Sequence, residues 1–137
     1  SEKNMNNKIL IVSANYYKEI SKNLELGATN ILKENNYEYE VINAPGCFEI
    51  PYLIKKYIGD FRGFISLGCI IKGDTYHFEI IANETSRKIM DLSVDFNIPI
   101  GFGILTCYDL KQAVIRSDVN QKNKGQEAAL ACIQLLK

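Results

Sequence analysis

The sequence predicts an α/β fold in which four parallel strands form a sheet covered by helices on both faces. Two observations carry this prediction. Apolar runs typical of buried strands alternate along the chain with segments whose apolar residues recur at helical spacing. Such alternation is typical of a parallel sheet with right-handed crossovers. The chain has 137 residues, 47% of them hydrophobic, and we expect residues 1–137 to form one domain with a real core.

The first half of the chain is expected to contain two strands and two helices. Residues 9–12 are a β-branched-rich run that suits a strand covered on both faces. Residues 20–32 carry apolar side chains at helical spacing, and the asparagines at 35–36 end that helix. Residues 38–43 alternate as a second strand does. Pro51 then begins a short helix that stops at Gly59.

The second half repeats the alternation. Residues 62–71 predict the third strand, and residues 76–96 predict a long helix because apolar positions recur in steps of three and four. After the break at residues 97–99, a fourth strand is expected over residues 100–105, loosened by two glycines. A short helix capped by an aspartate at 109, a polar connector and a final helix rich in small residues complete the chain.

Composition excludes several classes of protein. Sixteen basic residues balance sixteen acidic ones, which argues against nucleic acid as the main partner. Four cysteines without CxxC spacing accompany a single histidine, so we expect reduced thiols in a cytoplasmic protein and no metal site. The first seven residues are polar and are expected to form a flexible leader. With no apolar segment of membrane length, we expect no membrane partner.

The segment over residues 68–79 (GCIIKGDTYHFE) concentrates groups that carry chemistry at an expected strand-to-helix turn. Asp74 or Thr75 is a natural N-cap, and either places His77 in the first helical turn. The free N–H groups of a helix start bind anions, and a neutral imidazole accepts a proton. The pattern therefore indicates an anion-binding turn beside an acid/base group. A tight structural connection with a polar helix-start histidine remains the alternative.

Two further turns are expected beside this one, because every strand-to-helix turn of a parallel sheet lies at the same edge. Tyr16 and Phe48 offer rings for stacking on a planar heterocycle, and Glu49 offers a hydrogen-bond acceptor for hydroxyl or amino groups. Gly46 permits an unusual backbone angle. The alternatives also stay open: each ring packs on its own helix, and Glu49 complements a helix N-terminus.

Arg116 and Lys124 are the remaining candidates for binding phosphate. A guanidinium binds phosphate through two parallel hydrogen bonds. Taken alone, both residues fit solvated surface charge better than a binding site, and they are remote in sequence from the three turns. They join the site only if the chain folds back or if a second copy of the chain supplies them.

Together these residues resemble the lumazine synthase family. The resemblance runs from Lys8 to the end of the chain and consists of five motifs in the order and spacing of the family. The motifs are residues 45–51 (PGCFEIP), residues 68–79, residues 99–106 (PIGFGILT), Gln112-Ala113 with Arg116, and residues 123–129 (NKGQEAA).

The resemblance implies a flavodoxin-like, three-layer α/β/α sandwich that assembles at least into pentamers, with active sites between subunits. A sixty-subunit shell is the larger alternative, and riboflavin synthase is an implied partner. The implied reaction condenses 5-amino-6-(D-ribitylamino)uracil with 3,4-dihydroxy-2-butanone 4-phosphate to 6,7-dimethyl-8-ribityllumazine, with release of phosphate and water. This is the penultimate step of riboflavin biosynthesis, and it uses no cofactor and no metal.

The resemblance also implies roles for individual residues. His77 moves protons. The pyrimidine and the ribityl chain are held by Tyr16, Cys47, Phe48, Glu49, Phe102 and Lys124. The phosphate is held by Asp74, Thr75 and Arg116. The adjacent subunit donates Phe102, Arg116 and Lys124.

The chain departs from the family in two places. Tyr17 follows the stacking ring where the family usually has asparagine, and the connector over residues 117–122 lacks the glycines and the lysine of many members. The connector has no extra residues, so both the pentamer and the shell stay open. A flavin- or lumazine-binding protein without catalysis and a structural shell-former are the rival hypotheses. His77 beside Arg116 favours the enzyme, because a simple binder needs no proton shuttle.

Overall fold

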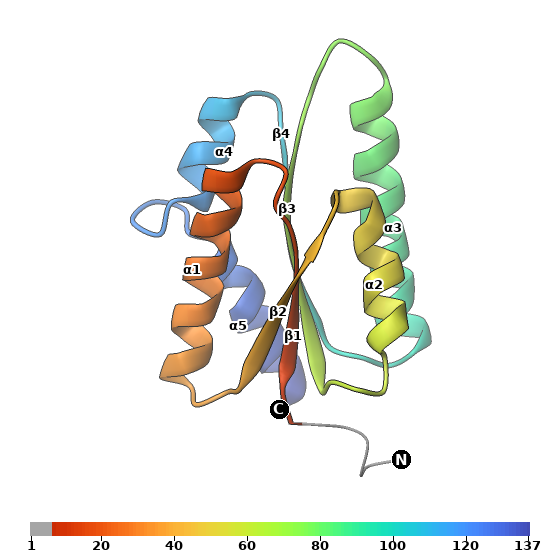
Figure 1. The fold of residues 1–137 in the computed structure, drawn as a ribbon, viewed down its shortest axis with the longest axis vertical. Coiled ribbons are helices and arrows are strands. Elements are labelled where there is room, and N and C mark those ends of the chain that lie inside the picture. The colour runs from red at the N-terminus through yellow and green to blue at the C-terminus, as the bar shows by residue number, and fades with distance from the viewer. Residues whose placement is uncertain (1–6) are drawn as a thin grey trace.

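The computed structural model describes residues 7–137 (Figure 1). Apart from Asn7, the expected flexible leader lies outside the described residues. The elements follow in the order β1 (Ile9–Ala14), α1 (Lys18–Glu34), β2 (Tyr39–Ala44), the 3₁₀ turn η2 (Cys47–Glu49), α2 (Ile50–Tyr57), β3 (Gly63–Ile71), α3 (His77–Asp95), β4 (Ile100–Cys107), α4 (Leu110–Ser117) and α5 (Lys124–Leu136).

The sheet in the described part of the chain has four strands, all parallel, in the order β2-β1-β3-β4. The register places Ile9 beside both Tyr39 of β2 and Gly63 of β3. Eight of the nine residues of β3 are buried, as a central strand covered on both faces requires. The predicted α/β fold with a four-stranded parallel sheet is confirmed.

Two helical layers cover the sheet. Figure 1 shows α1, α4 and α5 on one face and α2 and α3 on the other. Successive side chains of a strand point to opposite faces, so Ile9 and Ile11 join the core under α1 while Leu10 and Val12 join the core under α2. The arrangement is the expected three-layer sandwich, with one apolar cluster on each side of the sheet.

Small residues let α5 approach its neighbours closely, as its composition predicts. A Cβ at Gly101 of β4 would collide with the backbone of Ala128, and one at Gly125 would collide with the backbone of Leu24 in α1. Larger side chains at either position would push α5 away from the sheet or from α1. The start of α5, which carries Lys124, is therefore held against both neighbours.

Most predicted boundaries are confirmed. Asn35 ends α1, Gly59 beyond α2 has a φ of 98°, and the Asp109 carboxylate accepts a hydrogen bond of 2.8 Å from the backbone of Gln112 at the start of α4. The prediction for Gly46 is wrong, because its φ of −158° is extended backbone that any residue adopts. The first and last strands each extend two residues beyond the expected ranges, which brings them closer to the functional edge.

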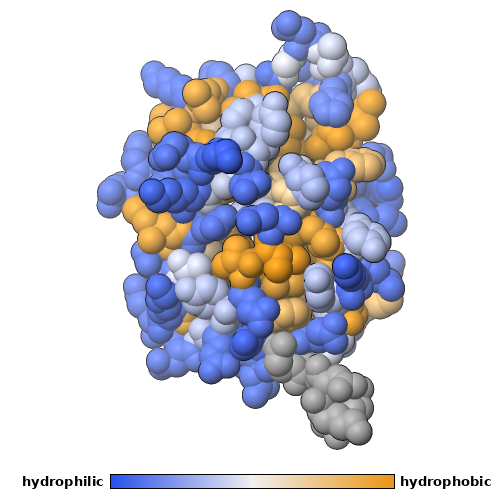
Figure 2. All heavy atoms as spheres, viewed as in Figure 1, coloured by the Kyte–Doolittle hydropathy of each residue, from blue (hydrophilic) through white to orange (hydrophobic). Residues whose placement is uncertain are grey.

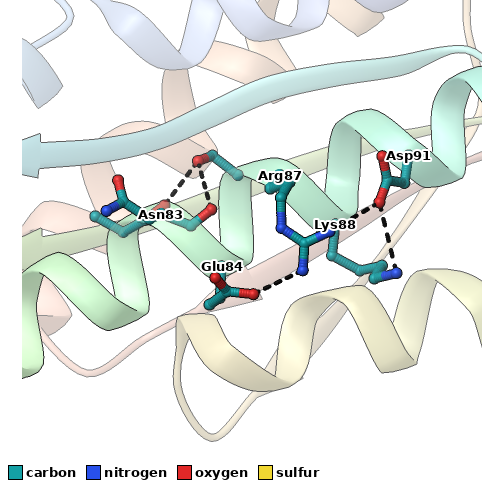
Figure 3. Close-up of polar contacts among 7 residues, drawn as sticks. Asn83, Glu84, Arg87, Lys88 and Asp91 are labelled. Carbon is teal, nitrogen blue, oxygen red and sulfur yellow. Dashed lines mark hydrogen bonds and ion pairs between the residues drawn. The ribbon is translucent and has the colours of Figure 1, made fainter.

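The solvent side of α3 carries a ladder of ion pairs. Figure 3 shows the Arg87 guanidinium between the Glu84 carboxylate at 2.7 Å and the Asp91 carboxylate at 3.2 Å, with Lys88 reaching the same aspartate. Pairs at this spacing support a helix by only a few tenths of a kcal/mol each. The ladder therefore describes a solvated helix face, and no catalytic role follows from it.

Hydrophobic surface is also exposed. Figure 2 shows it at the top of the view, over the ends of the strands and helices, and again across the middle of this face. The exposed large side chains include Tyr16, Phe48 and Phe102, with exposed fractions of 75%, 57% and 45%. Within residues 7–137, no helix combines the length and the apolar character that crossing a membrane requires.

Candidate active site

A pocket of about 700 Å³ opens at the carboxyl ends of β1, β2 and β3, which lie in the upper half of Figure 1. All three predicted turns contribute to it: Tyr16 from the first, Cys47, Phe48 and Glu49 from the second, and His77 from the third. The topology of the parallel sheet thus gathers residues that are far apart in sequence. We call this pocket the strand-end pocket.

Two adjacent tyrosines form one wall of the strand-end pocket. The Tyr16 ring is exposed, and the Tyr17 ring lies nearly perpendicular to it, at 83°, with 4.9 Å between the ring centroids. Tyr17 packs against the core cluster beneath α1, and burial raises the pKa of its phenol. The exposed Tyr16 ring therefore packs edge-to-face against the Tyr17 ring, which itself packs against the core.

The second wall is the η2 turn, which positions an aromatic ring beside a carboxylate. Cys47 is buried and anchors the turn, while Phe48 is exposed. The backbone N–H of Glu49 donates to the Gly46 carbonyl at 3.2 Å, which closes the turn. Pro51 lies in the first turn of α2, where its missing N–H costs nothing.

The segment over residues 68–79 differs in detail from its prediction. Gly68 lies inside β3 rather than in the turn, and a Cβ there would meet the Cys47 sulfur at 2.6 Å, so a larger residue would not fit without a shift. The N-cap of α3 is Tyr76, so the expectation of Asp74 or Thr75 at that position is wrong. The Thr75 hydroxyl still accepts a hydrogen bond of 3.3 Å from the backbone N–H of His77, which begins the first turn of α3 as predicted.

An ion pair ties the two ends of the β3–α3 loop together. Lys72, just beyond β3, pairs with the Glu79 carboxylate in the first turn of α3, and this hydrogen bond lowers the pKa of Glu79. The backbone N–H of Lys72 donates to the Cys107 carbonyl at 2.9 Å, which fixes the loop to β4 as well. Asp74 and Thr75 lie on this loop, are exposed and are not among the residues that line the strand-end pocket.

Phe102, Arg116 and Lys124 line a second, smaller pocket of about 270 Å³. We call it the edge pocket, because β4 is an edge strand of the sheet. The Arg116 guanidinium donates to the Gln112 carbonyl at 3.3 Å, and the Lys124 ammonium pairs with Glu127 at 3.2 Å. The edge pocket therefore holds two cations beside an exposed aromatic ring.

Among the described residues, the strand-end pocket and the edge pocket share no lining residue. One contains an imidazole, two exposed aromatic rings and a carboxylate, and the other contains the arginine and the lysine. One copy of the chain thus brings together five of the predicted site residues in one place and three in another.

The four cysteines are buried free thiols, and two of them, Cys47 and Cys69, line the strand-end pocket. Burial raises the pKa of Cys47 to about 11 and the pKa of Cys69 and Cys132 to about 12. The pKa of Cys107 is also raised by burial, although nearby Arg116 opposes the shift. The thiols therefore stay protonated near neutral pH, which makes them poor nucleophiles.

These raised pKa values predict that stability falls at alkaline pH. An unfolded thiol ionises near pH 8.5, whereas the folded thiols hold their protons to about pH 11 or 12. The unfolded chain binds fewer protons between those limits, so the free energy of unfolding should decrease as pH rises through the window. Urea denaturation at about pH 8, 9 and 10 measures the slope. Cys132→Ala should show a shallower slope, and an unchanged slope would contradict the assignment.

Several residues of the two pockets were missed by reasoning from the sequence. Tyr17, Ile80 and Ile81 line the strand-end pocket, and Glu127 lines the edge pocket. Both isoleucines follow His77 at the start of α3. Ile81 is one of the apolar positions at helical spacing that predict a buried helix face, and Ile80 lies outside that set. Tyr17 was treated only as the neighbour of Tyr16. Glu127 was visible in the motif over residues 123–129, and its three-residue spacing from Lys124 was the available signal.

Metal binding finds no support in the described side chains. No group of three or more histidine, cysteine, aspartate and glutamate side chains within residues 7–137 is placed to hold a metal ion. The side chains of the strand-end pocket offer stacking, hydrogen bonding and proton transfer, and those of the edge pocket offer the binding of anions.

Comparison with known proteins gives a consistent result. A family model described as 6,7-dimethyl-8-ribityllumazine synthase matches residues 6–137. Proteins of that name are similar over nearly the whole chain. The one from Bartonella bacilliformis is 44% identical over 140 residues, covering 97% of this chain and 92% of the relative. The one from Novosphingobium aromaticivorans is 46% identical over 131 residues, covering 94% of each chain, and the one from Zymomonas mobilis is 44% identical over 130 residues, covering 93% of each.

Proposed function

The chain belongs to the 6,7-dimethyl-8-ribityllumazine synthase family, and from that premise we propose the reaction that it catalyses. The proposed substrates are 5-amino-6-(D-ribitylamino)uracil and 3,4-dihydroxy-2-butanone 4-phosphate, and the products are 6,7-dimethyl-8-ribityllumazine, phosphate and water. The enzyme is then a transferase of riboflavin biosynthesis. The location that we propose is the cytoplasm, where reduced thiols such as the four of this chain persist.

One observation carries the proposal. The strand-end pocket, at about 700 Å³, places an imidazole beside two exposed aromatic rings and a carboxylate that come from three separate turns. A pocket of this size accommodates a small-molecule substrate. A planar amino-substituted pyrimidine with a hydroxylated chain needs these groups: a ring to stack on and an acceptor for its hydroxyl hydrogens.

The aminouracil therefore occupies the strand-end pocket in this proposal. Tyr16 stacks on the pyrimidine ring, and the Cys47–Glu49 turn holds the ribityl chain, with the Glu49 carboxylate accepting from its hydroxyl groups. The Phe48 ring lies next to that carboxylate and is exposed, so it can cover the apolar edge of the substrate.

The phosphate of the second substrate is held from two directions. The first backbone N–H groups of α3 and the loop carrying Asp74 and Thr75 supply donors at the positive end of the helix dipole. The Arg116 guanidinium of a neighbouring copy supplies a bidentate fork, and Lys124 of that copy adds a second positive charge. Phe102 in the same edge pocket faces the aminouracil across the interface.

His77 acts as the acid/base group. Condensation of the amine with the ketone, loss of phosphate and ring closure each need protons moved between heavy atoms. His77 begins α3 and lines the strand-end pocket, so it lies between the proposed pyrimidine and phosphate positions. Holding both substrates in one site also removes much of the entropic barrier to their condensation.

The proposed assembly uses both pockets of every copy. If the edge pocket of each copy meets the strand-end pocket of the next copy in one direction, the contact is head-to-tail, and a head-to-tail contact that closes produces a ring. We propose a pentameric ring, with the sixty-subunit shell as the larger alternative. Sedimentation analysis separates the two.

Absorbance tests the proposed function. The purified protein is mixed with both substrates, and growth of the lumazine chromophore is followed over time. Catalysed growth that depends on both substrates is the expected result. A protein that binds a lumazine or a flavin but produces no chromophore would overturn the enzyme and leave a binding protein.

A further inference from the structure

We propose that Tyr17 is a positioning residue: its core-anchored ring holds the Tyr16 ring in the orientation that stacks on the pyrimidine. This inference rests on the proposed function and adds a residue to it. It concerns the position at which this chain departs from the usual family pattern of an aromatic residue followed by asparagine.

The contact between the two rings is the first support. Their centroids are 4.9 Å apart and their planes cross at 83°, which is the edge-to-face geometry that aromatic pairs prefer. Tyr16 is 75% exposed, so its ring has few other neighbours to restrain it. A ring restrained by one close aromatic contact depends on that contact for its orientation.

The anchoring of Tyr17 is the second support. Its ring packs against the core cluster beneath α1, and its carbonyl accepts a hydrogen bond of 2.9 Å from the backbone of Ser21 in the first turn of α1. Both the side chain and the backbone of Tyr17 are thus held by the fold. The contact with this fixed ring therefore limits the orientations that the Tyr16 ring can adopt.

The position of Tyr17 in the helix is the third support. Tyr17 is the N-cap residue of α1, and its side chain makes no capping hydrogen bond. Asparagine, aspartate or serine at an N-cap stabilises a helix through such a bond. The tyrosine thus serves the pocket rather than the helix start, and local rules tend to be broken in this way at functional sites.

A double-mutant cycle tests the proposal. The KM for each substrate, kcat and Tm are measured for Tyr16→Ala, Tyr17→Leu and the double variant. Tyr17→Leu should raise the KM for the aminouracil about 3–10-fold, while the KM for the butanone phosphate stays unchanged. In the Tyr16→Ala background, Tyr17→Leu should have no further effect on that KM, because Tyr17 acts through Tyr16.

Three further variants sharpen the cycle. Tyr17→Phe keeps the ring contact and should retain most of the affinity for the aminouracil. Tyr17→Met keeps a long, adaptable apolar side chain without a ring and replaces Tyr17→Leu if the latter does not fold. Tyr39→Leu is the matched control, because Tyr39 packs against the same core cluster at the opposite end of the sheet. It should lower Tm without changing the KM for the aminouracil.

The outcomes separate this inference from the proposed function. If Tyr17→Leu and Tyr16→Ala have additive effects on the KM for the aminouracil, Tyr17 contacts the substrate directly and the positioning role is overturned. The positioning role is also overturned if Tyr17→Leu changes Tm and leaves the KM for the aminouracil unchanged. If Tyr16→Ala itself leaves that KM unchanged, the stacking ring of the proposed function fails instead.

Discussion

Replacing His77 with alanine is expected to lower kcat by about 10²–10⁴-fold without abolishing turnover. His77 begins α3 and lines the strand-end pocket, and it is the single histidine of the chain. Without His77, water must donate and accept the protons. Residual activity is expected because the pocket still holds both substrates together, and positioning supplies much of the acceleration. Stopped-flow absorbance of the lumazine product measures kcat directly.

Two controls isolate proton transfer at His77. His77→Gln keeps a hydrogen-bonding side chain but exchanges no proton near neutral pH, so it should be about as slow as His77→Ala. Added imidazole should restore part of the rate of His77→Ala, because it diffuses into the space that the side chain leaves. A wild-type kcat in both variants would remove the acid/base role.

Replacing Arg116 with alanine is expected to raise the KM for the butanone phosphate by about 10–100-fold, since a charge-assisted hydrogen bond is worth about 1.5–3 kcal/mol. The KM for the aminouracil should change little, because that substrate occupies the strand-end pocket. Steady-state kinetics with one substrate saturating at a time separates the two constants.

The controls for Arg116 distinguish the guanidinium fork from charge and from stability. Arg116→Lys keeps the charge but loses the bidentate geometry. Its KM for the butanone phosphate should lie between those of Arg116→Ala and the wild type. Arg62→Ala is the matched control, because Arg62 lies over the Tyr37 ring, remote from both pockets. Arg116 also donates to the Gln112 carbonyl, so Tm is recorded for each variant. An unchanged KM for the butanone phosphate in Arg116→Ala would exclude the phosphate contact.

Much of the fold could be predicted from the sequence because the signals were local. The β-branched run at residues 9–12 and the helical stripe over residues 76–96 each depend on side-chain periodicity within one element. The N-cap of α3 was predicted incorrectly: it is Tyr76, in a loop whose two ends are joined by the Lys72–Glu79 ion pair and whose start is bonded to the Cys107 carbonyl of β4. Those contacts join residues from different elements, and no local pattern reveals them.

The candidate site divides in the same way. Residues in strand-to-helix turns, such as Tyr16 and Glu49, could be placed near His77 because parallel topology brings such turns to one edge. Arg116 and Lys124 could not be joined to them by topology, and the structure puts them in the separate edge pocket. The role of Tyr17 was hidden for a third reason: it depends on an angle between two rings, which no sequence pattern encodes.

The central claim is that two copies of the chain share each active site, and mixed assembly tests it most directly. His77→Ala and Arg116→Ala chains are co-refolded in equal amounts and assayed at a low concentration of the butanone phosphate. If sites are shared, about a quarter of the interfaces pair an intact strand-end pocket with an intact edge pocket, so activity should rise to about a quarter of the wild-type value. Activity equal to the mean of the two parent variants would contradict the shared site.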